Sequence, residues 1–230
     1  IVERLLCLMD VNAGEINNMN IKEATDNVGG LSSPGKMPGY SWSISARRCD
    51  VGAKLVDVKD SVCEGCYALK GRYRFSNVKD ALERRYDAWA DNRELWVKSM
   101  IYLMNNKKMT PHFRWFDSGD IQGMEMLDDI AEIARGAPRI RFWLPSKEYG
   151  LIKIWLKMND CPENLIIRVS APMMNQNINN FTFTSGVYSH DNLYMVKKST
   201  ICPASWQENQ CKDCRKCWSD KIPTVNYVGH

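Results

Sequence analysis

The chain has 230 residues, of which 44% are hydrophobic and 25% are charged, and its formal net charge is +4. This composition is typical of a globular protein, and the length suits one large domain with at most a small appendage. The longest apolar stretches have the length of a strand, which argues against a bilayer-spanning helix and predicts no membrane partner. The mild positive charge permits an anionic partner without requiring one.

Nine cysteines are the most informative feature of the composition. Their odd number, together with the lack of a signal-peptide pattern, argues against a secreted disulfide scaffold. In a reducing cytoplasm, clustered cysteines bind metal more often than they form disulfides. We therefore expect a metal-binding protein of the cytoplasm.

Three segments follow one another along the chain. Residues 1–40 are dense in Asn, Gly, Ser and Pro, which predicts an irregular segment. Residues 41–200 form the predicted core, and residues 201–230 form a cysteine-rich tail packed on that core. Apolar periodicity predicts helices over 77–105, 124–135 and 149–158. Strands are predicted over 41–46, 112–117, 139–144, 164–170, 186–189 and, more weakly, 193–197.

The alternation of strands and helices predicts an α/β fold with a parallel sheet. The repeating units are too few for a complete eight-unit barrel, which leaves a partial βα (TIM-like) barrel or an open doubly wound sheet. We take the partial barrel as the prediction. In both architectures, ligands bind at the carboxyl ends of the strands.

Polar residues follow the predicted strands at those ends. Asp117 and Asp120 close the second strand, and as candidate catalytic residues they would hold a cation, an amine or a sugar hydroxyl. Their alternative role is to cap the following helix. His190 follows a later strand and is a candidate acid, base or cluster ligand. The glycine-rich loops of nucleotide-binding proteins and the nucleophile elbow of serine hydrolases do not occur.

The tail contains four cysteines in the pattern C-x8-C-x2-C-x2-C: Cys202, Cys211, Cys214 and Cys217. Two-residue gaps allow neighbouring thiolates to reach one metal centre through a tight turn. Four thiolates complete either a [4Fe-4S] cluster or a tetrahedral zinc site, and three closely spaced cysteines favour the cluster. A disulfide pair with free thiols is the weaker alternative.

A second group consists of Cys49, Cys63 and Cys66, which lie just after the first predicted strand. Three thiolates would leave one iron of a cluster open to a substrate or cofactor. Catalytic zinc sites likewise keep one coordination position free of protein ligands. Three alternatives stay open for these residues. They form a separate site, share one mixed site with the tail cysteines, or bind no metal, with Cys63 and Cys66 as a redox pair.

Four stretches of the sequence resemble the gene product 88 family of tailed phages. They are Lys36–Ser43, Cys63–Tyr73, Arg114–Asp120 and Cys202–Trp218, and the resemblance extends over roughly residues 35–228. It implies a phage-encoded protein in the cytoplasm of the infected bacterial host, with an iron–sulfur cluster. The family has no settled reaction, so the resemblance supplies none.

The sequence also loosely resembles the radical S-adenosylmethionine enzymes, which carry a three-cysteine cluster loop after the first strand of a partial βα barrel. That resemblance implies S-adenosylmethionine as a cofactor, with Tyr67 beside the cysteine loop and Ser118 after the second strand as cofactor-binding residues. The spacing differs, because thirteen residues separate Cys49 from Cys63 where that superfamily has three.

Two functions follow from these observations. The first is an iron–sulfur enzyme that acts on a small-molecule substrate at the mouth of a partial barrel. The second is a non-catalytic module, stabilised by clusters or by zinc, that binds a host protein or nucleic acid. A basic cluster with interleaved aromatic residues would serve the second function: Arg47, Arg48, Lys70, Arg72, Arg74, Arg84 and Arg85. Its alternative role, which the acidic residues scattered through the same region favour, is a solvated basic face.

Overall fold

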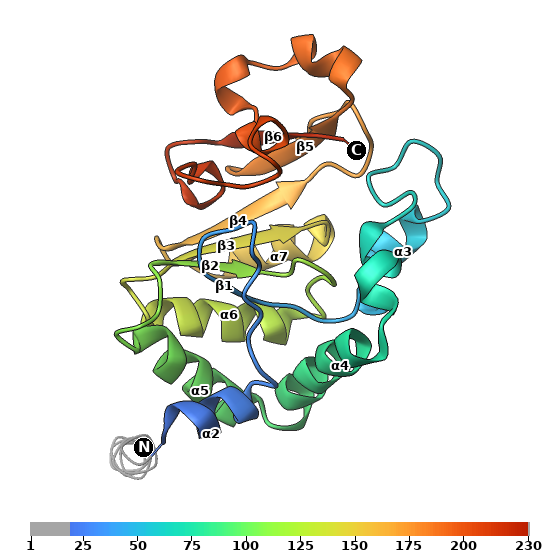
Figure 1. The fold of residues 1–230 in the computed structure, drawn as a ribbon. Helices are drawn as coiled ribbons and strands as arrows, with labels where there is room; N and C mark the ends of the chain where they lie inside the picture. The colour runs from blue at the N-terminus through green and yellow to red at the C-terminus, as the bar shows by residue number, and fades with distance from the viewer. Residues whose placement is uncertain (1–18, 230) are drawn as a thin grey trace.

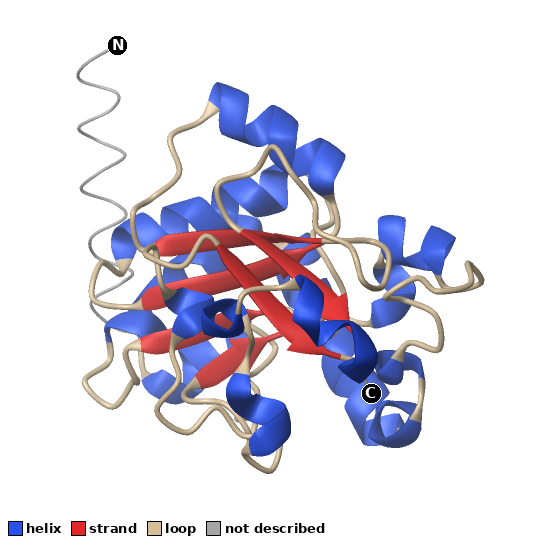
Figure 2. Ribbon diagram, turned by 90° about the horizontal axis from the view of Figure 1, so that it is seen from above, coloured by secondary structure: helices blue, strands red, loops and turns tan. Residues whose placement is uncertain are grey.

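A single six-stranded sheet organises the protein in the computed structural model, which describes residues 19–229. All the strands are parallel, and their order in the sheet follows their order in the chain. Figure 2 shows them side by side in one twisted sheet. The strands are β1 (Tyr40–Trp42), β2 (His112–Trp115), β3 (Arg141–Ser146), β4 (Leu165–Ser170), β5 (Thr184–Tyr188) and β6 (Thr224–Val228).

One helix precedes β1, and the others fill the connections between the first four strands. They are α2 (Ile21–Asn27), α3 (Val51–Leu55), α4 (Ser76–Asp91), α5 (Arg93–Asn105), α6 (Met124–Gly136) and α7 (Tyr149–Met158). Short 3-10 turns make up much of the rest, among them η4 (His190–Met195) and η7 (Lys216–Trp218). None of the described helices is long and apolar enough to cross a membrane.

The predicted α/β fold with parallel strands is confirmed, and two local predictions were wrong. The helix predicted over 77–105 is two helices, because the backbone of Asn92 leaves the helical region and its side chain caps α5 by accepting from Leu95 N at 3.1 Å. The weak strand predicted over 193–197 lies in and just after η4. The tail also contains β6, a strand of the sheet that was not predicted.

The irregular segment predicted over 1–40 includes α2, which begins with Asn20 accepting from Glu23 N. Residues 1–18 of that segment, including Cys7, lie outside the described residues. The division into segment, core and tail stays a prediction.

One face of the sheet packs on the helices. Because the strand order always advances in the same direction, right-handed crossovers place the connecting helices on the same face. Phe142, Leu144 and Trp115 point to that face and belong to the main apolar core. Figure 1 shows α5 and α6 beneath β1–β4.

The opposite face is covered by the cysteine-rich tail, which Figure 1 draws in orange and red. Trp143 alternates with the core residues of β3 and packs with Cys217, Trp218 and Val225 in a second apolar cluster. The indole nitrogen of Trp218 donates to the carbonyl of Phe113 at 2.8 Å, which fixes the tail over β2. The sheet is open, with β1 and β6 at its two edges, so the described strands form no closed barrel.

Candidate functional site

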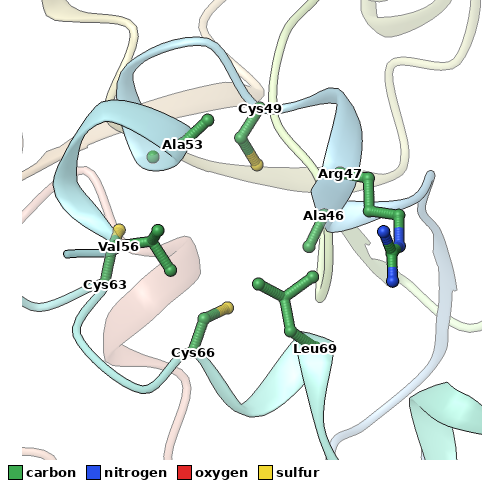
Figure 3. A pocket seen from close by; sticks show the side chains of 9 residues that line it. Ala46, Arg47, Cys49, Ala53, Val56, Cys63, Cys66 and Leu69 are labelled. Carbon is green, nitrogen blue, oxygen red and sulfur yellow. The ribbon is translucent and has the colours of Figure 1, made fainter.

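Three cysteines from the loop after β1 line one pocket. The side chains of Cys49, Cys63 and Cys66 surround a space of about 350 Å³, whose other walls include Ala53 and Leu69. Figure 3 shows Cys49, Cys63 and Cys66 around this space. Cys49 lies just before α3, and Cys63 and Cys66 lie together in one later turn of the loop. The structure therefore brings together the three residues that the sequence analysis grouped.

Local structure explains how thirteen intervening residues still bring Cys49 to Cys63. Part of that segment folds into α3, and a turn returns the chain to Cys63. Gly65, at φ 63°, allows the tight turn in which Cys66 N donates to Cys63 O at 3.1 Å. Gly52 keeps the pocket open, because a Cβ there would lie 3.6 Å from the sulfur atoms of both Cys49 and Cys63.

The cysteine loop is held to the body of the protein by its own hydrogen bonds. Val51 N donates to Glu148 Oε1 at 3.0 Å, and Val62 N donates to Pro172 O at 2.8 Å. The side-chain amide of Gln122 donates to Arg48 O at 2.8 Å. These bonds position the loop at the carboxyl ends of β2, β3 and β4 without using a cysteine side chain.

Burial and mutual repulsion disfavour free thiolates in this pocket. Burial raises the pKa of Cys49 to about 12, and the charges of Asp120, Cys63 and Cys66 act in the same direction. Burial also raises the pKa of Cys63, whereas Lys147 lowers it. The thiolates therefore need a positive centre in the pocket, or they stay protonated.

The cysteine pocket adjoins a larger cavity of about 610 Å³ at the carboxyl ends of the strands. This volume lies within the usual range for small-molecule sites. Asp117, Ser118 and Asp120 from the loop after β2 line it, together with the three cysteines. The position agrees with the general rule that ligands of parallel sheets bind at these ends.

The two predicted catalytic carboxylates differ in their surroundings. Asp117 accepts hydrogen bonds from the hydroxyls of Ser43 and Tyr73, and the Tyr73 bond is 3.2 Å long. Asp120 accepts from the backbone nitrogens of Ile121 and Lys147, both at 2.9 Å. Burial raises the pKa of Asp120. Asp120 thus ties the β2 loop to the β3 loop, whereas Asp117 faces hydroxyl groups.

The remaining predicted site residues are placed as follows. The Tyr67 hydroxyl donates to the Asp117 carbonyl, and Tyr67 lines the cavity. Ser118 also lines it, although its hydroxyl donates to Ile44 O at 2.7 Å. His190 is exposed, packs edge-on against Trp206 with ring centroids 6.5 Å apart, and does not line the cavity. The structure therefore does not bring His190 to Asp117 and Asp120.

The four tail cysteines form a second group. Cys202 N donates to Asn226 O of β6 at 2.7 Å, and Cys211 N donates to Lys36 O, in the segment before β1, at 2.9 Å. Burial raises the pKa of Cys217 to about 12, and Cys202 and Cys211 add to the effect. Cys202 and Cys214 likewise act on Cys211. The charges of these four thiols therefore act on one another, as do the charges of Cys49, Cys63 and Cys66.

A buried cation lies beneath the tail group. The fully buried Arg168 side chain donates to five backbone carbonyls, those of Thr184, Lys216, Ser219, Ile222 and Pro223, at 3.0–3.5 Å. All five acceptors are neutral, and Arg168 forms no ion pair with a carboxylate of the described residues. Tyr227 and Cys217 are the acidic groups that act on its charge.

Several arginines of the predicted basic cluster make contacts with other residues of the chain. Arg48 pairs with Glu83 at 2.7 Å and stacks on the ring of Tyr86. Arg84 and Arg85 donate to Gly29 O and Gly30 O at 3.3 and 3.0 Å. These guanidinium groups are therefore occupied by contacts within the chain, which leaves a smaller basic surface than the sequence indicates.

One basic residue of the cavity, Arg114, escaped the sequence prediction, whereas Lys147 belongs to the polar strand ends that it indicated. Arg114 and Lys147 lie on β2 and just after β3, and both line the large cavity. A single basic residue in or after a strand carries no motif, so only the alternation along β2 would have placed Arg114 opposite the core face. Among the described residues, no three His, Cys, Asp or Glu side chains converge closely enough to hold one metal ion.

Comparison with known proteins gives one match. No curated protein and no solved structure matches the chain. The family model described as gene product 88 matches residues 16–220, which is most of the chain and includes both cysteine groups and the cavity loops. The expected resemblance is thereby confirmed, and the chain belongs to the gene product 88 family.

Proposed function

We propose that this protein is an iron–sulfur protein, and that Cys49, Cys63 and Cys66 hold a [4Fe-4S] cluster at the mouth of a partial-barrel-like sheet. One observation carries the proposal. Three thiols from two parts of one loop line a pocket of about 350 Å³, which adjoins a cavity large enough for a small molecule. Three protein ligands would leave one iron directed toward that cavity.

We favour a cluster over zinc because the three cysteines line a pocket. A zinc ion binds its ligands around one point, with Zn–S distances of about 2.3 Å. In a [4Fe-4S] cluster, each cysteine binds a different iron atom, so the ligands are arranged around a larger unit. A pocket of about 350 Å³ lined by three cysteines suits such a unit.

Residues around the pocket would position the cysteines and supply charged groups for a bound molecule. The loop bonds of Val51 and Val62 hold the cysteines in place. Burial raises the pKa of Cys63, and the positive charge of Lys147 offsets part of that rise. Asp117 offers a carboxylate already surrounded by hydroxyls. When bound, the cluster would supply single electrons and an open coordination position, which suits S-adenosylmethionine beside Tyr67 and Ser118.

We infer a second, structural cluster at Cys202, Cys211, Cys214 and Cys217. Four thiolate ligands would leave no open position. The buried charge of Arg168, which neutral carbonyls surround, would be offset by an anionic thiolate cluster near Cys217. This arrangement suits a centre that fastens the tail onto the sheet.

A non-catalytic module is the second candidate function, and the contacts that attach the tail to the sheet favour it. Trp218 and Arg168 attach the tail to β2 and β4, so a metal there would act as a staple whether or not the front pocket performs chemistry. Such a module would bind a host protein or nucleic acid. Under either function, we expect a phage gene product in the bacterial cytoplasm.

Iron, zinc and acid-labile sulfide per chain, measured on protein purified without oxygen, test the proposal. Two clusters predict about eight iron and eight sulfide. Cys49→Ala with Cys63→Ala should halve both values, and Cys161→Ala, which changes an isolated half-buried thiol, should leave them unchanged. Zinc without sulfide in the wild-type protein would refute the cluster and support the stapled module.

A further inference from the structure

Arg114 is the feature of the cavity that the proposed function does not use. It lies on β2, on the face opposite the helices, and lines the cavity of about 610 Å³. Its guanidinium carbon lies 4.6 Å from the centre of the Trp143 ring, and its Nη1 donates to the sulfur of Met37 at 3.3 Å. These contacts fix the orientation of the guanidinium and provide only weak acceptors.

The positive charge of Arg114 lacks a direct counterion. Its Nε is buried without a hydrogen-bond partner, and no carboxylate of the described residues forms an ion pair with it. The carboxylate that acts most on its charge belongs to Asp117, whose oxygens accept from Ser43 and Tyr73 instead. The residue is half-buried, but its buried Nε is costly to leave unpaired unless a bound anion accepts from it.

Two tyrosines act on the charge of this cation. They are Tyr67 and Tyr227, and both line the same cavity. The Tyr67 hydroxyl contacts Asp117 O, and the Tyr227 hydroxyl contacts Cys217 Sγ at 3.2 Å. A planar guanidinium is suited to an oxyanion, which accepts two parallel bonds from arginine.

We propose that Arg114 binds the anionic group, a carboxylate or a phosphate, of a small organic ligand in this cavity. The Ser170 and Ser185 hydroxyls, 3.1 Å apart on the neighbouring strands, supply polar contacts for the remainder of that ligand. The inference deepens the proposed function, because it rests on the same cavity being the ligand site. Anion binding itself does not require the cluster.

Thermal unfolding in the presence of inorganic phosphate, succinate or chloride, at matched ionic strength, tests the inference. We expect phosphate, succinate or both to raise the unfolding midpoint by about 2–4 °C relative to chloride. The two oxyanions distinguish a phosphate ligand from a carboxylate ligand. Arg114→Met should abolish the shift, whereas Arg141→Met, which removes an exposed arginine of β3, should retain it.

Arg114→Lys provides a second measurement if Arg114→Met does not fold. Lysine keeps the charge but loses the planar pair of donors, so the dissociation constant of the anion should rise about tenfold. No shift with either oxyanion, an equal shift in Arg114→Met, or an unchanged constant in Arg114→Lys would overturn the assignment. Iron and sulfide, measured on the same preparations, show separately whether the cluster proposal fails.

Discussion

The two cysteine groups differ in what surrounds them. The front group, Cys49, Cys63 and Cys66, opens onto a large cavity, and hydrogen bonds from other residues hold its loop in place. The tail group lies against the sheet, beside the fully buried Arg168. One group therefore has the surroundings of a reactive site, and the other has those of a structural centre.

This difference in surroundings, and not only the number of cysteines, separates the front group from the tail group. The front loop would keep its position without metal, because Val51, Val62 and Gln122 supply its contacts. The tail has only a small apolar cluster of its own around Trp218. We therefore expect stability to depend on the tail group and chemistry to depend on the front group.

The largest expected effect is on folding, from Cys214→Ala in the tail. Loss of a structural metal site should lower the free energy of unfolding by about 4 kcal/mol or more. Cys66→Ala in the front loop should change it by less than about 1 kcal/mol. Chemical denaturation measures both, and equal losses in the two variants would abolish the distinction between the groups.

Arg168→Met should have the next largest effect. It leaves the carbonyls of Ser219 and Ile222 without their donor, and we expect a loss of about 3 kcal/mol in unfolding free energy. Exposed Arg141→Met serves as the control and should stay within about 0.5 kcal/mol. The metal content of the Arg168 variant should fall at the tail alone; a fall at the front pocket would contradict the separate roles.

Gly52→Ala should affect the front pocket and leave the fold intact. The new Cβ would lie 3.1 Å from Cys49 Cβ and 3.6 Å from two sulfur atoms, so it should lower iron occupancy at this site severalfold. Gly150 holds the equivalent second position of α7 with open space around it, so Gly150→Ala is the matched control. Both changes should raise helix stability by at most about 1 kcal/mol. Equal iron in the two variants would argue against a group bound in the pocket.

The smallest expected effect is on the pH dependence of stability, through His112 of β2 where it packs against the tail. Burial, Arg215 and Arg141 lower the pKa of His112, whose ring packs edge-on against Trp218 at 5.4 Å. The folded state therefore binds the proton less tightly than the unfolded state, and stability is lost as pH falls below about 6.5 toward the lowered pKa. His112→Gln should flatten this decline in denaturation curves, by less than about 1 kcal/mol because solvent screens the half-buried ring.

Strong periodic patterns allowed the main elements to be predicted. The strands β2, β3 and β4 and the helices α6 and α7 were expected nearly at their observed bounds, because each has a continuous apolar strand or an apolar helix face. The break at Asn92 has no Gly or Pro to mark it. The β6 strand was not predicted because its alternating pattern is only five residues long and follows a polar, cysteine-rich segment.

The site was predictable only where residues carry a motif. Cysteine spacing alone groups Cys49, Cys63 and Cys66, and the position of Asp117 at a strand end indicates its place beside the cavity. The roles of Arg114 and Lys147 depend on which face of β2 and which loop meet in space, and no local pattern encodes that meeting. His190 follows a strand as expected, yet η4 turns it toward Trp206 and away from the cavity.

The strand order has a consequence for synthesis on the ribosome. Because helices cover only one face of the sheet, the other face stays uncovered until Trp218 and β6, which follow β5 in the chain, have been synthesised. Until then, the Arg168 side chain has no carbonyls from Ser219 or Ile222 to bind. The nascent chain therefore holds an exposed sheet surface and a half-formed cavity until β6 is in place.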